Sequence, residues 1–275
     1  MRFVFRNDPC GIACVVFTYF LLCYADFVVV QYLAPSFTNS HWKSIHLVLF
    51  NLVLILSLTS HIRASISDPG EVPISGTKLD FSDLLVGSGH DSSEKGKEDR
   101  DDGWTLCNKC ESYRPPRAHH CRICRRCIRR MDHHCPWINN CVGELNQKFF
   151  ILFLIYTGLA CVYALILTIV AMVKGFGSNR VQPAAIICSV FLIMESIIFL
   201  LFVSFIGCDQ FQGIFEDMTQ VEWIQKKSPM RHRKSRMALL GEVFGRGHCR
   251  CRYLCWILPT SPNLSRLSSN RFSQA

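Results

Sequence analysis

Four long apolar stretches constrain the fold of this 275-residue chain more than any other feature of its sequence. They cover residues 10–33, 45–66, 149–173 and 183–207, in a chain that is 49% hydrophobic. A helix needs about 20 apolar residues to cross the hydrocarbon core of a bilayer, and each stretch is long enough to do so. A helix in a soluble core rarely stays apolar over this length. We therefore predict an all-α integral membrane protein with four transmembrane helices.

The first stretch has an alternative interpretation as a signal peptide, because Arg2 and Arg6 precede it. Its apolar run is too long for a signal peptide, and no cleavage site with small residues is evident. We therefore interpret residues 10–33 as a membrane-spanning helix.

The distribution of lysine and arginine predicts the orientation. The connection 34–44 carries only Lys43, whereas segment 67–148 and the tail after Gly207 carry many basic residues. Lys174 and Arg180 in the third connection are the exception. The positive-inside rule places both termini and segment 67–148 in the cytosol. Because the cytosol is reducing, closely spaced cysteines there are expected to bind metal rather than to form disulfides.

The formal net charge of +9 lies mostly in these predicted cytosolic parts. Such a surface suits a lipid bilayer with anionic lipids, or a ligand that carries phosphate. A short basic tail beside a membrane is commonly an orientation signal, so we expect no nucleic-acid partner.

The predicted cytosolic parts divide into three pieces. Residues 75–103 are rich in Gly, Ser, Asp, Glu and Lys, and are predicted to be a flexible linker. Residues 104–146 form a cysteine-rich module that is too small for an adequate hydrophobic core. The tail, residues 208–275, begins with an amphipathic helical pattern over 208–227 and ends in a Ser-rich segment.

The module contains seven cysteines and four histidines between Cys107 and Cys141. Tetrahedral zinc takes four Cys or His ligands, and Cys-x2-Cys pairs let two sulfurs reach one ion. One such pair could be a redox site, but two pairs followed by further Cys and His predict structural zinc. Six cysteines with two histidines provide eight ligands, which leaves Cys135 uncoordinated. The spacing does not decide between His119 and His120, or between His133 and His134.

The pattern resembles the cysteine-rich domain of the DHHC protein S-acyltransferases. The resemblance rests on Cys107-x2-Cys110, Arg114-Pro115, Arg117, His119-His120-Cys121, Cys124, Cys127, Met131-Asp132-His133-His134-Cys135-Pro136-Trp137, Asn139-Asn140-Cys141, Gly143 and Asn146. The order of helices and loop is similar to that family, as is Asp68-Pro69-Gly70 after the second stretch. The resemblance covers residues 10 to about 222.

The resemblance implies a role for each of these side chains. Two interleaved sites would each hold a structural Zn²⁺: one is Cys107, Cys110, His120 and Cys127, and the other is Cys121, Cys124, His134 and Cys141. Cys135 would be the nucleophile, His133 its general base, and Asp132 the group that orients His133. A thiolate is the reactive form of cysteine, so a neighbouring imidazole suits this chemistry.

The resemblance also implies a reaction and its partners. Cys135 would take a palmitoyl group from a long-chain acyl-CoA and pass it to cytosolic cysteines of membrane-associated proteins. The acyl chain would lie in an apolar cavity lined by helices 149–173 and 183–207, where small residues such as Ala160 leave room. Among nearby basic residues, Arg129, Arg130 and Lys148 are candidates for binding the CoA phosphates. Family members occur mostly in the Golgi apparatus and endoplasmic reticulum, so the Golgi is the expected location.

One element departs from the family pattern. The family's Thr-Thr-x-Glu element appears as Thr219-Gln220-Val221-Glu222, with Gln220 in place of the second Thr. This departure leaves open the contact that the element makes with the catalytic loop.

Other polar residues have no assigned role. Asp26 and Glu195 lie within predicted spans, where an ionisable group is often functional, but neutral carboxyls stabilised by neighbouring helices are the simpler interpretation. Cys249, Cys251 and Cys255 in the tail are either acylated or reduced thiols.

Two other functions compete with acyl transfer. A membrane-anchored zinc adaptor would explain the metal ligands but would give Cys135 and Asp132 no role. A transporter or channel would leave the cysteine-rich module unexplained.

Overall fold

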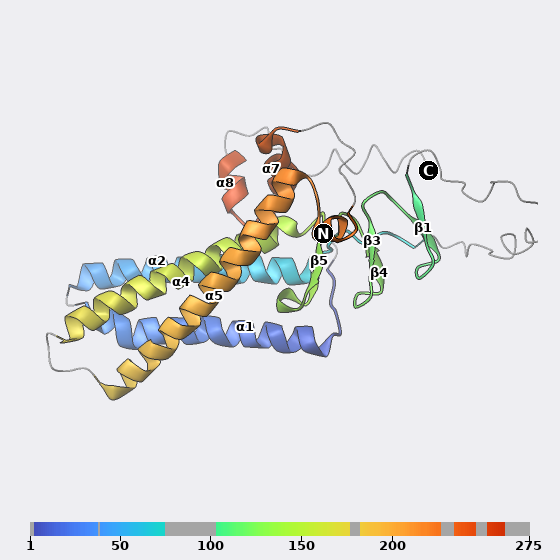
Figure 1. Cartoon of the computed structure of the whole chain (residues 1–275). Coiled ribbons are helices and arrows are strands. Elements are labelled where there is room, and N and C mark those ends of the chain that lie inside the picture. Colours follow the sequence, from blue (N-terminus) through green and yellow to red (C-terminus); the bar gives the residue numbers. More distant parts are fainter. Residues whose placement is uncertain are drawn as a thin grey trace, which may run out of the picture.

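A computed structural model describes residues 3–37, 39–74, 103–176, 182–226, 234–245 and 252–261. Four long helices dominate it: α1 (Pro9–Val28), α2 (Ser40–Ile66), α4 (Gln147–Phe176) and α5 (Pro183–Glu216). All four are long and apolar enough to cross a membrane. The predicted four-helix membrane architecture is therefore confirmed. Helix α4 packs along both α2 and α5, so it is the central helix of the bundle (Figure 1).

The ends of the helices follow from local sequence. Asp8 caps α1 by accepting a hydrogen bond of 3.0 Å from a backbone N–H of the first turn, and Pro9 occupies the first helical position. Asn39 caps α2 in the same way, at 2.9 Å. Helix α5 continues to Glu216, beyond the apolar stretch, and stops where Asp217 adopts a left-handed conformation with φ of 50°.

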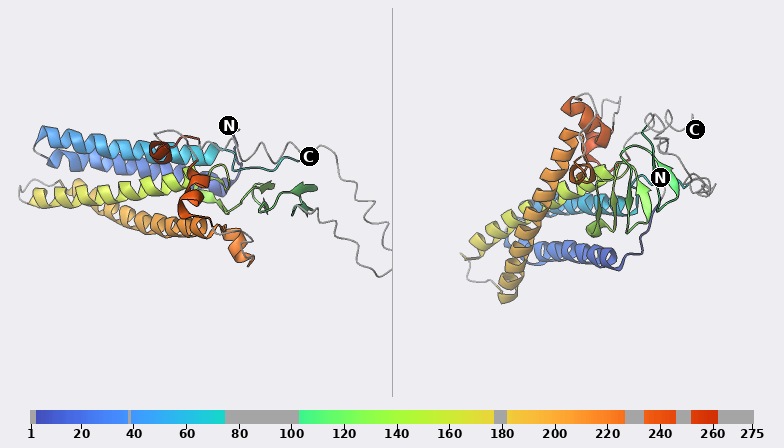
Figure 2. Two further views of the ribbon diagram at one scale, coloured as in Figure 1. Left: turned by 90° about the horizontal axis from the view of Figure 1, so that it is seen from above. Right: turned by 45° about the vertical axis from the view of Figure 1, so that its right-hand side comes forward.

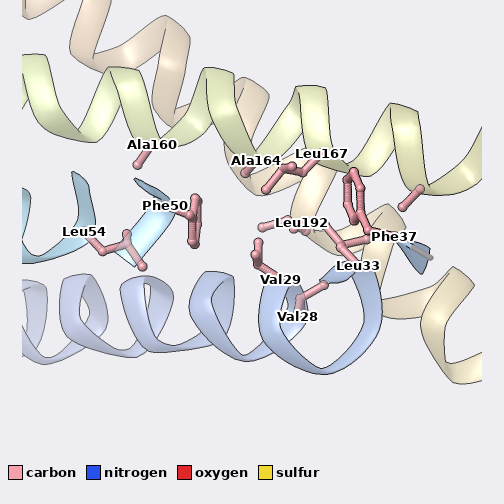
Figure 3. Close-up of a cluster of buried hydrophobic side chains, with 11 residues drawn as sticks. Val28, Val29, Leu33, Phe37, Phe50, Leu54, Ala160, Ala164, Leu167 and Leu192 are labelled. Carbon is pink, nitrogen blue, oxygen red and sulfur yellow. The ribbon is translucent and has the colours of Figure 1, made fainter. Parts of the chain in front are cut away.

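The core of the bundle is an apolar cluster shared by all four helices (Figure 3). It includes Val28 of α1, Phe50 and Leu54 of α2, Ala164 of α4 and Leu192 of α5. Small residues on α4 let the helices approach closely, which matters in lipid because burial there gives no hydrophobic driving force. A buried hydrogen bond of 2.9 Å between the hydroxyls of Ser57 and Thr157 also joins α2 to α4.

The cysteine-rich module lies at one end of the helix bundle (Figures 1 and 2). Its strands pair as three antiparallel hairpins: β1 (Thr105–Cys107) with β2 (Ser112–Arg114), β3 (His119–Cys121) with β4 (Arg126–Ile128), and β5 (His133–Cys135) with β6 (Asn140–Val142). The short 3-10 helix η3 (Pro136–Ile138) links the last two strands. The sequence analysis did not anticipate these hairpins, because strands of three residues are too short to show an alternating apolar pattern.

Each hairpin turn contains one residue in the left-handed conformation. These residues are Glu111, Arg125 and Asn139, with φ values of 49°, 52° and 48°. The turn at Asn139 rests against α1. A side chain at Gly11 of α1 would place its Cβ 2.2 Å from the Asn139 side chain, so the close approach requires glycine there.

Two buried asparagines fasten the module to the end of α2. The side-chain amide of Asn140 donates to the carbonyls of Ala64, Ser65 and Ser67 at 3.2, 3.1 and 2.9 Å. The amide of Asn146 donates to the Ala64 carbonyl at 3.1 Å. These bonds satisfy carbonyls that the end of a helix leaves without partners.

The chain after α5 folds back on the bundle. It forms α6 (Gln220–Ile224), α7 (Arg236–Phe244) and α8 (Arg252–Ile257). Trp256 of α8 donates to the carbonyl of Gly245 at 3.0 Å, and the Tyr156 hydroxyl of α4 donates to the carbonyl of Ile257. The tail thus packs against the helices. The predicted linker, except Gly103, lies outside the described residues, as do Cys249, Cys251 and residues 262–275.

We predict that Asn140→Ala destabilises the protein, because three carbonyls lose a buried donor. The expected loss is about 1–3 kcal/mol. It is measured as a lower thermal unfolding midpoint of the zinc-loaded protein in detergent. Asn108→Ala is the control, because Asn108 lies exposed in a hairpin turn of the same module. Equal midpoints for the two variants would contradict this role of Asn140.

Candidate active site and metal centres

Two groups of four side chains in the module bring sulfur and nitrogen atoms together. Within each group, the possible ligand atoms all lie within 4.8 Å of one another. Site 1 is Cys107, Cys110, His120 and Cys127, and site 2 is Cys121, Cys124, His134 and Cys141. These are the same two sets of residues that the family resemblance implies.

The distances in site 2 fit a tetrahedron around zinc. Nδ1 of His134 lies 3.7, 3.4 and 3.6 Å from the sulfurs of Cys121, Cys124 and Cys141. Zinc bonds of about 2.3 Å to sulfur and about 2.0 Å to nitrogen would separate such atoms by roughly 3.5–3.8 Å. The four side chains therefore suit a structural Zn²⁺ with three thiolates and one imidazole.

Each metal site joins two hairpins. It combines a histidine and a cysteine that lie directly opposite each other in one hairpin with two cysteines of the preceding hairpin. In site 1, His120 lies opposite Cys127 across β3 and β4, and its Nδ1 is 3.2 Å from the Cys110 sulfur of the first hairpin. In site 2, His134 lies opposite Cys141 across β5 and β6. The β3–β4 hairpin supplies ligands to both sites, so two ions would cross-link all three hairpins.

Strand β5 directs adjacent residues to different sites. Side chains alternate between the two faces of a strand. His134 therefore points to site 2, while His133 and Cys135 lie on the opposite face. The Cys135 thiol belongs to neither ligand group, and it lies close enough to the His133 ring to help raise the pKa of that ring. The metal ligand His134 thus lies on one face of β5, and the His133 imidazole and the Cys135 thiol lie together on the other face.

Asp132 holds the His133 ring in a defined orientation. Nδ1 of His133 lies 2.7 Å from Oδ2 of Asp132. When Nδ1 donates its hydrogen to this carboxylate, Nε2 remains to accept the proton of the Cys135 thiol.

The electrostatics of this pair favour the protonated form of His133, which makes the ring a stronger base for the thiol proton. Burial lowers the pKa of His133, but its hydrogen bonds to Asp132 and Cys135 have the larger combined effect and raise this pKa to about 9. Burial raises the pKa of Asp132, but the hydrogen bond with His133 helps to bring it below its usual range.

The thiol lies where the module meets the helices. Cys135 is only 4% exposed. It packs in an apolar cluster with residues such as Phe150 and Phe153 of α4 and Val203 of α5. The His133 ring contacts the Phe150 ring edge to face, at 5.4 Å between centroids. The Cys135 thiol and the His133 imidazole therefore lie together at one end of an apolar helix bundle.

Comparisons with known proteins identify the family of the chain. A model of the family described as DHHC palmitoyltransferase matches residues 100–227. Palmitoyltransferase ZDHHC7 of Mus musculus is 39% identical over 252 residues, which cover 89% of this chain and 78% of that protein. Palmitoyltransferase ZDHHC3 of Homo sapiens is 37% identical over 247 residues, which cover 88% of this chain and 79% of that protein.

The chain belongs to the DHHC palmitoyltransferase family. It is a multi-pass membrane enzyme that S-palmitoylates proteins. A plant relative, probable protein S-acyltransferase 13 of Arabidopsis thaliana, is 36% identical over 200 residues, covering 67% of this chain and 62% of that protein.

The replacement of the second Thr by Gln220 in the Thr-Thr-x-Glu element keeps a contact between this element and Asp132. The backbone N–H of Gln220 donates to Oδ1 of Asp132 at 2.9 Å. A backbone donor does not depend on the side chain at position 220.

The sequence analysis missed a second donor, Gln210, whose side-chain amide bonds Oδ2 of Asp132 at 2.6 Å. A single glutamine on a long helix carries no motif that would have identified it.

An ion-pair network connects the module to the chain after α5. The Arg117 guanidinium bonds Glu222 at 2.6 Å and Asp217 at 2.8 Å. Arg130 pairs with Asp217 and with Glu242 of α7, at 3.2 Å each. Burial raises the pKa values of these three carboxyls, but the partner cations bring them below their usual range.

Each of the three predicted CoA-binding residues bonds other groups of the protein. Lys148 is only 2% exposed, and its ammonium donates to the carbonyls of Cys255 and Thr260 at 2.7 Å each. Arg130 is engaged in the ion-pair network. Arg129 pairs at 3.4 Å with Glu144, and both side chains are partly exposed. The sequence shows that these residues are charged, but it does not show which groups of the same chain they will bond.

An apolar cleft lies between the membrane-spanning helices. Its lining includes Leu22 of α1, Ala160 and Cys161 of α4, and Phe199 of α5, together with residues of α2. Glu195 also lines it. The cleft is narrow, with a cavity volume of about 40 Å³. Its walls thus come from all four helices, and not only from the two that the sequence analysis named.

The alternation on β5 predicts different metal contents for two adjacent histidine variants. We expect two zinc ions per chain in the purified protein. His134→Ala should lose about one ion, because it removes a ligand of site 2, whereas His133→Ala should keep both. The zinc content is measured by elemental analysis after gel filtration. An equal loss of zinc in the two variants would show that the histidine assignment is wrong.

Proposed function

We propose that Cys135 forms the acyl-enzyme of this palmitoyltransferase, using a long-chain acyl-CoA as co-substrate. The observation that supports this most strongly is the position of Cys135, outside both ligand groups and beside an imidazole oriented by Asp132. His133 takes the thiol proton, and the Cys135 sulfur attacks the thioester carbonyl carbon. A new carbon–sulfur bond forms, the bond to the CoA sulfur breaks, and CoA leaves as a thiol with the proton that His133 returns.

The second half of the reaction repeats the exchange with a different thiol. A cytosolic cysteine of a membrane-associated protein attacks the acyl-enzyme carbonyl, and Cys135 leaves as a thiolate. His133 accepts the proton of the incoming thiol and passes it to the Cys135 thiolate, which returns both groups to their starting state. Because the site lies at the end of the bundle, acceptor cysteines must come close to the bilayer surface.

The apolar cleft is the proposed binding site for the palmitoyl chain. Phe153 lines the cleft and also packs in the cluster around Cys135, so the cleft begins near the nucleophile. Phe199 of the cleft contacts the Trp137 ring, two residues after Cys135, at 5.9 Å between centroids. Because the cavity is narrow, the chain would enter by displacing apolar side chains rather than by filling an open tunnel.

Arg129 is the one predicted residue that we retain as a CoA phosphate contact. Its pair with Glu144 is partly exposed, and such pairs exchange partners at little cost. For Lys148 and Arg130 a CoA contact stays a prediction, and it would compete with their bonds to the tail and to α7.

Two structural zinc ions would stabilise the module without taking part in the reaction. Site 1 and site 2 would each hold one ion, as the ligand distances indicate. Metal binding would supply folding free energy that the small apolar content of the module cannot provide. The ions would hold β5 in place, while proton transfer stays with His133.

The orientation and location complete the proposal. The basic residues of the module and tail support a cytosolic orientation of the site and of both termini by the positive-inside rule. An endomembrane location, with the Golgi apparatus first, follows from the family resemblance.

Labelling with acyl-CoA tests the nucleophile. Purified protein incubated with clickable palmitoyl-CoA should gain a label that hydroxylamine removes, and Cys135→Ser should lose that label. Cys208→Ser is the matched control, because Cys208 is exposed on α5 and should not affect the rate. If Cys135→Ser labels as fast as the unchanged protein, the acyl-enzyme lies elsewhere and the proposal is wrong.

A steric substitution tests the cleft. Ala160→Phe should fill the cleft and slow acylation by palmitoyl-CoA relative to octanoyl-CoA by about tenfold or more. The neighbouring Leu159 is 51% exposed, so Leu159→Phe should leave the ratio unchanged. The ratio is measured from acylation rates with the two donors in parallel. An unchanged ratio in Ala160→Phe would place the acyl chain outside this cleft.

A further inference from the structure

The carboxylate of Asp132 is held by three hydrogen-bond donors. Oδ2 lies 2.7 Å from Nδ1 of His133 and 2.6 Å from Nε2 of Gln210. Oδ1 accepts the backbone N–H of Gln220 at 2.9 Å. Asp132 is only 5% exposed, so these protein donors replace water around a buried charge. A buried carboxylate without such donors would be costly.

Gln210 comes from a part of the chain that the sequence does not connect with the reaction. It lies on α5, beyond the apolar stretch that ends at residue 207, and only 2% of its surface is exposed. Its side-chain oxygen accepts a hydrogen bond of 3.3 Å from the amide of Gln147 at the start of α4. This bond fixes which end of the Gln210 amide faces Asp132, so the NH₂ group must point to the carboxylate.

The backbone N–H of Gln220, which also donates to Asp132, is held in place by a bond to α5. The side chain of Gln220 bonds the carboxylate of Asp209, which is the residue before Gln210. This bond holds the backbone N–H of Gln220 near Asp132. Two consecutive residues of α5 therefore determine how both oxygens of the carboxylate are placed.

We infer that Gln210 is a positioning residue, which sets the orientation of His133 through Asp132. The same oxygen, Oδ2, bonds both Gln210 and His133, so a shift of the carboxylate would move the imidazole. Hydrogen bonds that hold a base in its productive orientation affect the rate without touching the substrate. This inference rests on the proposed roles of Cys135, His133 and Asp132. The alternative is that Gln210 is only a satisfied polar group in the helix packing.

A double-mutant cycle separates these two roles. The variants are Gln210→Met, Asp132→Ala and the combination, and the measured quantities are the rate of acyl-enzyme formation, the KM for palmitoyl-CoA and the zinc content. Gln210→Met keeps the length of the side chain but removes the donor. We expect it to lower the rate roughly tenfold at unchanged KM and unchanged zinc content. In the Asp132→Ala background it should cause no further loss, because the group that it positions is gone.

Two further variants make the test specific. Gln212→Met is the matched control, because Gln212 lies on the same helix with an exposed side chain that bonds Glu216 at 3.1 Å. It should leave the rate unchanged. Gln147→Met disturbs Gln210 indirectly from a partly exposed position, and should cause a smaller loss that also disappears in the Asp132→Ala background. It provides the same test if Gln210→Met does not fold.

Three results would overturn the inference. An unchanged rate in Gln210→Met would show that the hydrogen bond does not matter for the reaction. An equal loss in both backgrounds would assign Gln210 to helix packing alone, while the proposed function would stand. A rate in Asp132→Ala equal to that of the unchanged protein would instead show that the proposed role of Asp132 is wrong.

Discussion

The pairing of β5 with β6 positions both a metal site and the proposed nucleophile, Cys135, because neighbouring side chains on a strand point to opposite faces. His134 and its cross-strand partner Cys141 face site 2, while His133 and Cys135 lie on the other face. A slip of one residue in this register would exchange the two faces. The metal ligands on one face therefore hold β5 in place. The Cys135 thiol on the other face is positioned by the same strand but does not coordinate the metal.

The helix bundle provides the anchoring hydrogen bonds and the apolar surroundings that the cysteine-rich module lacks. The module has short strands and little apolar content, so its stability would depend on zinc and on bonds such as those from Asn140 to the end of α2. The apolar surroundings of Cys135 come from α4 and α5. The chain after α5 returns to the module and bonds both Asp132 and Arg117. Membrane packing and the geometry of the reacting groups are thus parts of one structure.

Local patterns made part of this structure predictable from the sequence. Long apolar stretches predicted the four spans, and Cys-x2-Cys spacing predicted metal sites. Spacing alone could not choose between adjacent histidines, because their orientation depends on strand pairing; the family resemblance chose His120 and His134, and the ligand distances agree. The positions of Lys148 and Gln210 were not predictable, because their partners lie far away in the sequence. A charge or an amide in a sequence does not reveal what it will bond.

The central claim is that Cys135 reacts while both metal sites remain complete. X-ray absorption at the zinc edge, before and after stoichiometric palmitoylation of the purified enzyme, tests this claim most directly. The account predicts an average of three sulfurs and one nitrogen per zinc ion in both samples, with no zinc released. A fall in the number of sulfur ligands, or release of zinc on acylation, would show that the reacting thiol is a metal ligand and would contradict the account.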